Sequence, residues 1–307
     1  MIPRNQIESL LTEQLGTPIT NIEPIDSGQI SEPYFFSAGG KDYVVRFAQP
    51  GHSDTLYKDR YVSTCLLSPD IPVPEFVAMG ELGDRTWAIT RRAPGKILDA
   101  YTGDKYEQLI PSIVRTLDRI HQTDISSTTG SGGFSADGEG RWNNWSEFLG
   151  SINKEEGEEG FYGKWHHLFD DSFLDHDLFH SVYHEMESLL KYCPEERYLV
   201  HADYAFDNVL AENGEVTAVI DWANSCFGDF LYDVAWMDIG MDKWYYADRF
   251  RQLYQEQGRK IAHYHERLRC YYCHVALDSF KFYAKTNQPA PYAWIKSRIE
   301  LLLEWKR

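Results

Sequence analysis

One stretch of the sequence decides the fold: Leu199-Val200-His201-Ala202-Asp203-Tyr204-Ala205-Phe206-Asp207-Asn208-Val209-Leu210. After a short turn it is followed by Thr217-Ala218-Val219-Ile220-Asp221-Trp222. This pattern predicts a short apolar strand, a polar loop and a second apolar segment that leads into the hairpin turn Asn213-Gly214. The strand after that turn ends in an acid, Asp221.

Three oxygen-bearing side chains of this stretch, those of Asp203, Asn208 and Asp221, are predicted to face one point in space. An Asp near a substrate hydroxyl can accept its proton, while Asn and Asp oxygens are the hard ligands that Mg²⁺ prefers. The order H-x-D-x-x-x-x-N, with another Asp at the end of the next strand, is that of a protein-kinase catalytic loop and its metal-binding Asp. Each residue alone is better explained as a turn or cap residue, but together they predict a phosphoryl-transfer site. His201 is predicted to be structural, because the adjacent Asp203 is better placed to act as the base.

This segment resembles the phosphotransferase signature of the aminoglycoside phosphotransferases, which are small-molecule kinases with a protein-kinase-like fold. The likeness covers most of residues 20–240 and is closest in pattern to the hygromycin-type members of that family. Further segments carry it in matching order and spacing: Leu56-Tyr57-Lys58-Asp59-Arg60-Tyr61-Val62, Ile71-Pro72-Val73-Pro74-Glu75, Arg91-Arg92-Ala93-Pro94-Gly95, Phe227-Gly228-Asp229 and Tyr232-Asp233-Val234-Ala235.

The resemblance implies an α+β, two-lobed, protein-kinase-like fold. Residues 1–92 would form a small nucleotide-binding lobe with an antiparallel sheet and one main helix. Residues 93–95 would form the hinge, and residues 96–307 a larger, mostly helical lobe with the catalytic hairpin and the acceptor site. Short β-prone runs precede the hinge and helical periodicities follow it, which agrees with this order.

Apolar periodicity predicts helices over residues 5–15 and 52–67, and beyond the hinge over residues 106–123, 143–152, 169–190, 233–239, 244–257, 263–286 and 293–305. The glycine-rich residues 129–140 lack the Lys-Ser/Thr ending of a phosphate-binding loop. They are predicted to form a long surface loop.

The resemblance also implies how the chain would bind ATP or GTP with Mg²⁺. Arg46 stands where most kinase-like enzymes have the Lys that contacts the α- and β-phosphates, and a guanidinium can grip phosphate through two N–H groups. Asp59 would be the acidic partner of Arg46. The loop at Ser27 and Gly28 would cover the nucleotide, although it lacks the G-x-G-x-x-G form. Adenine would meet the backbone of the hinge-side residues Arg91, Arg92 and Ala93.

The implied acceptor is a hydroxyl of an aminoglycoside or aminocyclitol antibiotic, with hygromycin B the best candidate, so that the enzyme would confer resistance. Acceptor contacts are expected at Asp207, Trp236 and Asp238. A formal net charge of −17 favours a polycationic small-molecule substrate and disfavours nucleic acid and membrane surfaces as partners. Two alternatives stay open: a kinase for another hydroxyl compound, such as a macrolide, an amino alcohol or a sugar, and a non-catalytic nucleotide-binding protein of the same fold.

Composition and the ends of the sequence predict a cytoplasmic protein. No apolar run approaches the ~18 residues of a membrane helix, and the N-terminus lacks the apolar core of a signal peptide. Five scattered cysteines argue for reduced thiols rather than a disulfide framework. Cys270 and Cys273 are zinc-ligand types, but their aromatic, helix-periodic context favours packing as small apolar residues.

Overall fold

The structure is a computed structural model that describes residues 2–26, 30–157, 160–240 and 245–304. The chain forms two compact units. Unit 1 comprises residues 1–127, 135–138 and 206–224, and unit 2 comprises residues 128–134, 139–205 and 225–307. The predicted lobes, residues 1–92 and 96–307 with a hinge at residues 93–95, stay a prediction.

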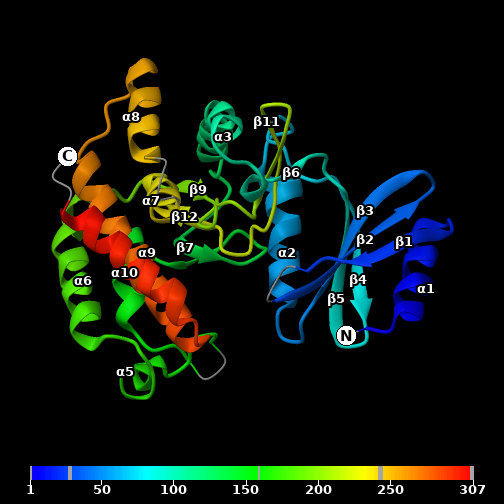
Figure 1. Cartoon of the computed structure of the whole chain (residues 1–307), viewed down its shortest axis with the longest axis horizontal. Helices are drawn as coiled ribbons and strands as arrows, with labels where there is room; N and C mark the ends of the chain where they lie inside the picture. The colour runs from blue at the N-terminus through cyan, green and yellow to red at the C-terminus, as the bar shows by residue number, and fades with distance from the viewer. Residues whose placement is uncertain (1, 27–29, 158–159, 241–244, 305–307) are drawn as a thin grey trace. The chain divides into compact units, whose positions relative to one another are not determined.

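Unit 1 contains a five-stranded antiparallel sheet with the strand order β1-β2-β3-β5-β4 (Figure 1). Its strands are β1 (Ile19–Pro24), β2 (Ser31–Ala38), β3 (Lys41–Ala48), β4 (Phe76–Leu82) and β5 (Arg85–Arg91). Strands β1 and β2, β2 and β3, and β4 and β5 pair antiparallel. The antiparallel sheet predicted before residue 93 is therefore present.

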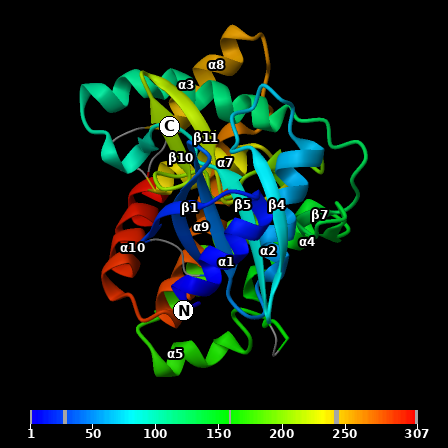
Figure 2. The same ribbon diagram turned by 90° about the vertical axis from the view of Figure 1, so that its right-hand side faces the viewer.

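Two helices cover the two faces of this sheet. Helix α1 (Arg4–Leu15) packs on one face and is seen across the sheet in Figure 2, while α2 (Ser53–Tyr61) packs on the other and continues as a π-helical turn, Val62–Leu66. Successive side chains of a strand point to opposite faces. Val45 and Phe47 of β3 therefore join the core beneath α1, and Ala48 packs with Leu56 of α2. Arg46, between them, faces α2.

The predicted hairpin is also part of unit 1. Strands β10 (Val209–Glu212) and β11 (Glu215–Val219) pair antiparallel, and β6 (Lys96–Ile97) adds a third strand. Asn213 and Gly214 have φ values of 53° and 83°, the two positive angles that a type I′ turn requires. Helix α3 (Asp104–His121) is tied to this hairpin, because the Ser112 hydroxyl donates to Glu215 Oε2 at 2.6 Å and accepts from the Val216 amide at 2.9 Å.

Unit 2 contains a second sheet, with the order β8-β7-β12-β9. Its strands are β7 (Ser131–Phe134), β8 (Gly140–Trp142), β9 (Tyr198–Val200) and β12 (Cys226–Gly228). The prediction of a surface loop over residues 129–140 is therefore wrong at both ends of that segment. Glycine weakens the strand signal, but here it is required: a Cβ on Gly132 would come within 2.6 Å of the Trp142 ring.

The helices of unit 2 surround α9 (Tyr264–Lys285), which contacts α6 (His176–Leu189), α7 (Leu231–Gly240) and α10 (Pro289–Glu304) (Figure 1). The remaining helices are α4 (Trp145–Gly150), α5 (Leu168–Asp171) and α8 (Tyr246–Glu256). Cys270 and Cys273 are buried free thiols on α9. Within the described residues, no helix has both the length and the apolar content to cross a bilayer.

One predicted helix, over residues 169–190, is broken into α5 and α6. The break occurs because Asp175 adopts an extended backbone and its carboxylate accepts a hydrogen bond from the Leu178 amide at 3.0 Å. This contact caps a new helix rather than continuing the previous one.

Candidate functional site

Arg46 and Asp59 form an ion pair within unit 1. Strand alternation turns Arg46 toward α2, and Asp59 lies on the helix face that packs against the sheet, where it is buried. Burial alone would lower the pKa of the Arg46 guanidinium, but the charges of Asp59 and Asp221 outweigh burial and raise it. Arg46 is therefore held as a cation beside two carboxylates. Its contact with the phosphates stays a prediction.

Helix α2 also holds the backbone that follows Asp221. The second carboxylate oxygen of Asp59 accepts a hydrogen bond from the Trp222 amide at 2.7 Å, and the ammonium of Lys58 donates to the Ala223 carbonyl at 2.9 Å. Lys58 is buried along with Asp59. Burial is the largest influence on the pKa of Asp59 and raises it, against the opposing effect of Arg46. Two adjacent residues of one helix thus hold the two residues after Asp221.

Asn208 and Asp221 lie at the same end of the hairpin formed by β10 and β11. Val209 pairs with Val219, and the Ile220 amide donates to the Asn208 carbonyl at 2.9 Å. Asp221 has a φ of 60°, a left-handed conformation that Asp tolerates better than most residues. The structure thus brings an amide oxygen and a carboxylate to one end of a rigid hairpin.

This donor set fits Mg²⁺, which in nucleotide sites binds one or two side-chain oxygens and completes its shell with water and phosphate. Among the described residues, no group of three or more His, Cys, Asp or Glu side chains could hold a metal ion by itself. The predicted ligands Asn208 and Asp221 agree with that sparse type of site and not with a protein-only metal cage.

The predicted adenine-binding residues follow β5. The Arg91 amide donates to the Glu75 carbonyl at 2.8 Å, and the Arg92 amide donates to the Asp42 carbonyl at 3.0 Å. Because both amides have partners, Ala93 is the better candidate for a backbone donor to adenine. Ser27 and Gly28, predicted to cover the nucleotide, lie outside the described residues, so that role stays a prediction.

Asp203 belongs to unit 2, where it is half-buried on the loop after β9. The start of that loop is held by Asp233 of α7, whose carboxylate accepts from the His201 amide at 2.9 Å and the Ala202 amide at 2.7 Å. Ala202 has a φ of 58°, which costs an Ala residue energy and persists only where the surroundings enforce it. Buried Asp233 thus sets the backbone from which Asp203 projects.

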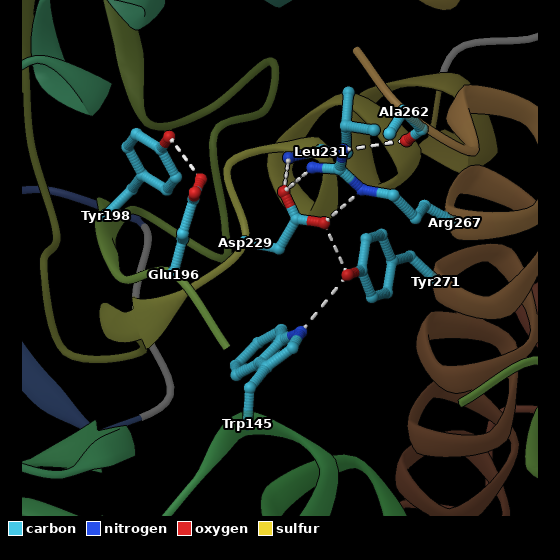
Figure 3. Close-up of polar contacts among 8 residues, drawn as sticks. All are labelled: Trp145, Glu196, Tyr198, Asp229, Leu231, Ala262, Arg267 and Tyr271. Carbon is cyan, nitrogen blue, oxygen red and sulfur yellow. Dashed lines mark hydrogen bonds and ion pairs between the residues drawn. The ribbon is translucent and has the colours of Figure 1, made fainter. Parts of the chain in front are cut away.

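A second buried acid, Asp229, joins the end of β12 to α9 (Figure 3). The Arg267 guanidinium donates to both of its carboxylate oxygens, at 2.8 Å and 2.5 Å, and the Tyr271 hydroxyl donates to it as well. The Trp145 indole donates to that hydroxyl at 3.2 Å. Gly228 precedes the acid because a Cβ there would come within 2.3 Å of the Trp145 ring. This paired, fully hydrogen-bonded charge anchors the segment between the hairpin and α7.

The three predicted acceptor-binding residues differ in environment. Asp207 is exposed and Trp236 is half-buried on α7. Asp238 is buried and accepts hydrogen bonds from the Tyr246 and Ala247 amides and from the Tyr272 hydroxyl, the last at 2.7 Å. These contacts favour a structural role for Asp238 at the start of α8. Acceptor binding by all three residues stays a prediction.

Comparison with known proteins agrees with this architecture. Residues 21–269 match the sequence profile of the phosphotransferase enzyme family. This chain belongs to the phosphotransferase enzyme family. The resemblance drawn from the motifs, and the two-lobed kinase-like fold class with its antiparallel sheet and helical part, are thereby confirmed.

Three known proteins match this chain along nearly its whole length. It is 30% identical over 301 residues to the hygromycin-B 4-O-kinase of Escherichia coli, covering 97% of this chain and 84% of that protein. It superposes with a TM-score of 0.83, at 28% identity, on a thermostable mutant of aminoglycoside phosphotransferase APH(4)-Ia in ternary complex with ADP and hygromycin B, covering 97% and 98% of the two chains. Spectinomycin phosphotransferase APH(9)-Ia, at 15% identity and a TM-score of 0.68 over 98% of both chains, shares the fold.

Sequence reasoning did not assign roles to Lys58, Asp233 or Asp229. The positions of Asp229 and Asp233 could have indicated a structural role, because charged residues within an apolar segment are buried only when they have partners. Nothing in the sequence indicates that Lys58 is buried, since a Lys on an amphipathic helix is usually solvated.

Proposed function

We propose that this phosphotransferase transfers the γ-phosphoryl group of ATP to a hydroxyl of hygromycin B or a closely related aminocyclitol, and so confers resistance to it. The observation that carries the proposal is the arrangement of Arg46, Asp59, Asn208 and Asp221 in unit 1. The similarity to a hygromycin-B kinase along almost the whole chain supports the choice of acceptor.

Each residue of the site has a distinct part in this proposal. Asp203 orients the acceptor hydroxyl and accepts its proton as the bond to phosphorus forms. Arg46 steadies the α- and β-phosphates, while Asn208 and Asp221 would hold Mg²⁺, which would supply positive charge to neutralise the phosphates. Positioning and charge stabilisation, rather than a covalent enzyme intermediate, lower the barrier.

The test is a coupled assay of ADP release with hygromycin B, other aminoglycosides, a macrolide, an amino alcohol and a sugar as acceptors. We expect turnover with hygromycin B and little with neutral acceptors. Turnover of only a neutral acceptor would refute the choice of substrate and leave a kinase, whereas no turnover with any hydroxyl compound would favour a non-catalytic nucleotide-binding protein.

A first prediction concerns the proposed base. Asp203→Asn keeps the size of the side chain but removes its charge and basicity, so kcat should fall at least ~10²-fold, the usual scale for a general base. Nucleotide affinity, measured by calorimetry, should change little. Asp84→Asn, an exposed acid between β4 and β5, is the matched control. Near wild-type kcat in Asp203→Asn would remove Asp203 from the catalytic role.

A further inference from the structure

A separate cluster of ligand-type side chains lies on α6 in unit 2. His176, His180 and His184 follow one another at intervals of four residues, so helical geometry places them on one face. The ring centroids of His176 and His180 are 4.3 Å apart, and those of His180 and His184 are 6.4 Å apart. None of these residues belongs to the proposed phosphoryl-transfer site.

Carboxylates orient the outer two rings. His176 Nδ1 lies 3.3 Å from Asp177 Oδ1, and His184 Nδ1 lies 3.6 Å from Glu187 Oε2. A carboxylate that accepts from Nδ1–H places the lone pair of the neutral ring on Nε2, the pairing found behind metal-binding histidines. The side chain of His176 is 62% exposed, so the ring can be reached by an ion in solution.

An aromatic ring also packs against His176 and His180. Phe169 of α5 packs edge-on against His176 at 5.1 Å and is stacked with His180 at 5.8 Å, with an interplanar angle of 28°. A ring that is held in place loses little conformational freedom when it binds a metal.

We propose that His176 and His180 form a two-histidine chelate for a divalent transition metal of the Zn²⁺ and Cu²⁺ class. Zn–N bonds are about 2.0–2.1 Å long, so one nitrogen from each of two rings at this spacing can reach a shared ion. Histidines at i and i+4 on a helix are the pair that zinc motifs use. In the described part of the chain no third His, Cys, Asp or Glu completes such a group. Water therefore fills the remaining positions, and binding is weaker than at a structural zinc site.

The test is calorimetric titration of the full-length protein, freed of any polyhistidine tag, with ZnCl₂. Titration with CuCl₂, followed by electron paramagnetic resonance, reports nitrogen ligands directly. We expect one site in the wild type, and His176→Asn and His180→Asn should each weaken it at least ~10-fold. Asp177→Asn should weaken it less than either histidine variant, because it removes only the group that orients His176.

His184→Asn is the matched control, since it removes an exposed histidine from the same helix face. It should leave the Zn²⁺ affinity and the nitrogen hyperfine pattern nearly unchanged. Equal Zn²⁺ affinity in the wild type and the double variant His176→Asn/His180→Asn would overturn the proposal, as would a loss in His184→Asn as large as that in His176→Asn. The readout is metal binding, so the outcome does not depend on which acceptor the enzyme phosphorylates.

Discussion

Lys58 is buried on α2 and its ammonium bonds the Ala223 carbonyl at 2.9 Å. Lys58→Met keeps the length of the side chain but removes this bond, which frees the backbone two residues beyond Asp221. A hydrogen bond to a charged group contributes roughly 1.5–3 kcal/mol, so we expect kcat/KM to fall about tenfold to a hundredfold. The Mg²⁺ concentration needed for half-maximal rate should rise as well, because Asp221, the proposed metal ligand, would be less well positioned.

Steady-state kinetics at varied Mg²⁺ measure both effects. Arg60→Met, an exposed residue of the same helix, is the control that should leave them unchanged. A Lys58→Met enzyme that loses stability but keeps its Mg²⁺ dependence would show that Lys58 contributes to the fold alone.

Asp238 is the residue whose environment predicts a pH effect on stability. Burial raises its pKa from 3.8 to about 7, against the opposing effects of its hydrogen bonds and of Arg298. The folded protein binds a proton at Asp238 more tightly than the unfolded chain does, because the folded-state pKa is the higher one. The stability that this protonation contributes is fully present below about pH 4 and is lost as pH rises through about 7.

Asp238→Asn removes this titration and keeps an oxygen acceptor for the Tyr246 amide. The unfolding free energy of the wild type should therefore rise relative to that of the variant between pH 8 and pH 5. The rise should be a few kcal/mol, at roughly 1.4 kcal/mol per unit of pKa shift. Urea unfolding at the two pH values measures it. If the difference in unfolding free energy between wild type and variant is the same at pH 5 and pH 8, Asp238 is ionised at both. A carboxylate that binds a cationic acceptor would behave in that way.

At the scale of elements, the hairpin turn starts the strand pairing that leads to Asn208 and Asp221, and one extra residue of β11 between Val216 and Ala218 shifts the register by one position on the way. Gly214 has a φ of 83°, and a Cβ there would meet nothing within 4 Å. An Ala at this position would therefore fit sterically, and its only cost would be the backbone strain of a positive φ. Gly214→Ala should lower the unfolding free energy by roughly 1–2 kcal/mol, the cost of a left-handed conformation for an L-residue. Chemical denaturation measures the loss.

Gly150→Ala is the matched control, because Gly150 ends α4 with helical angles and equally open space. Ala favours helix over Gly by up to about 1 kcal/mol, so this variant should be neutral or more stable. A Gly214→Ala protein as stable as the wild type would contradict the type I′ turn.

At the scale of the whole molecule, the net charge of −17 should attract a cationic acceptor through a field that salt screens. With a Debye length of ~8 Å at physiological ionic strength, the acceptor KM should rise markedly from low to high salt. The KM of a neutral acceptor should change much less. Steady-state kinetics across a salt series compare the two directly.

Variants separate a direct contact from this general field. Asp207→Asn should cost roughly 1–3 kcal/mol of acceptor binding if the exposed carboxylate touches the substrate. Glu8→Gln, an exposed acid on α1, should cost far less. If Asp207→Asn and Glu8→Gln weaken acceptor binding equally, Asp207 acts only through the net charge of the protein and does not contact the substrate.

Local sequence determined much of the fold and part of the site. The turn Asn213-Gly214, the alternation of Val45, Arg46 and Phe47, and the helical periodicities each express a short-range rule of backbone geometry. Such rules act between residues close in sequence, so a single sequence is sufficient to predict the hairpin with Asn208 and Asp221 near its ends. The extra residue of β11 and the side of the sheet that Arg46 faces are seen only in the structure.

Tertiary structure alone decided which partners hold the buried charged residues, and for Lys58 it also decided the burial. Lys58 contacts Ala223, and Asp233 contacts the amides of His201 and Ala202, across separations of 165 and about 31 residues. Asp238 is a further example. Resemblance suggests that it contacts the substrate, whereas in the structure its carboxylate accepts a hydrogen bond from the Tyr246 amide at the start of α8. A buried charge is stable only beside a partner, and that partner comes from a distant segment whose position no local pattern encodes.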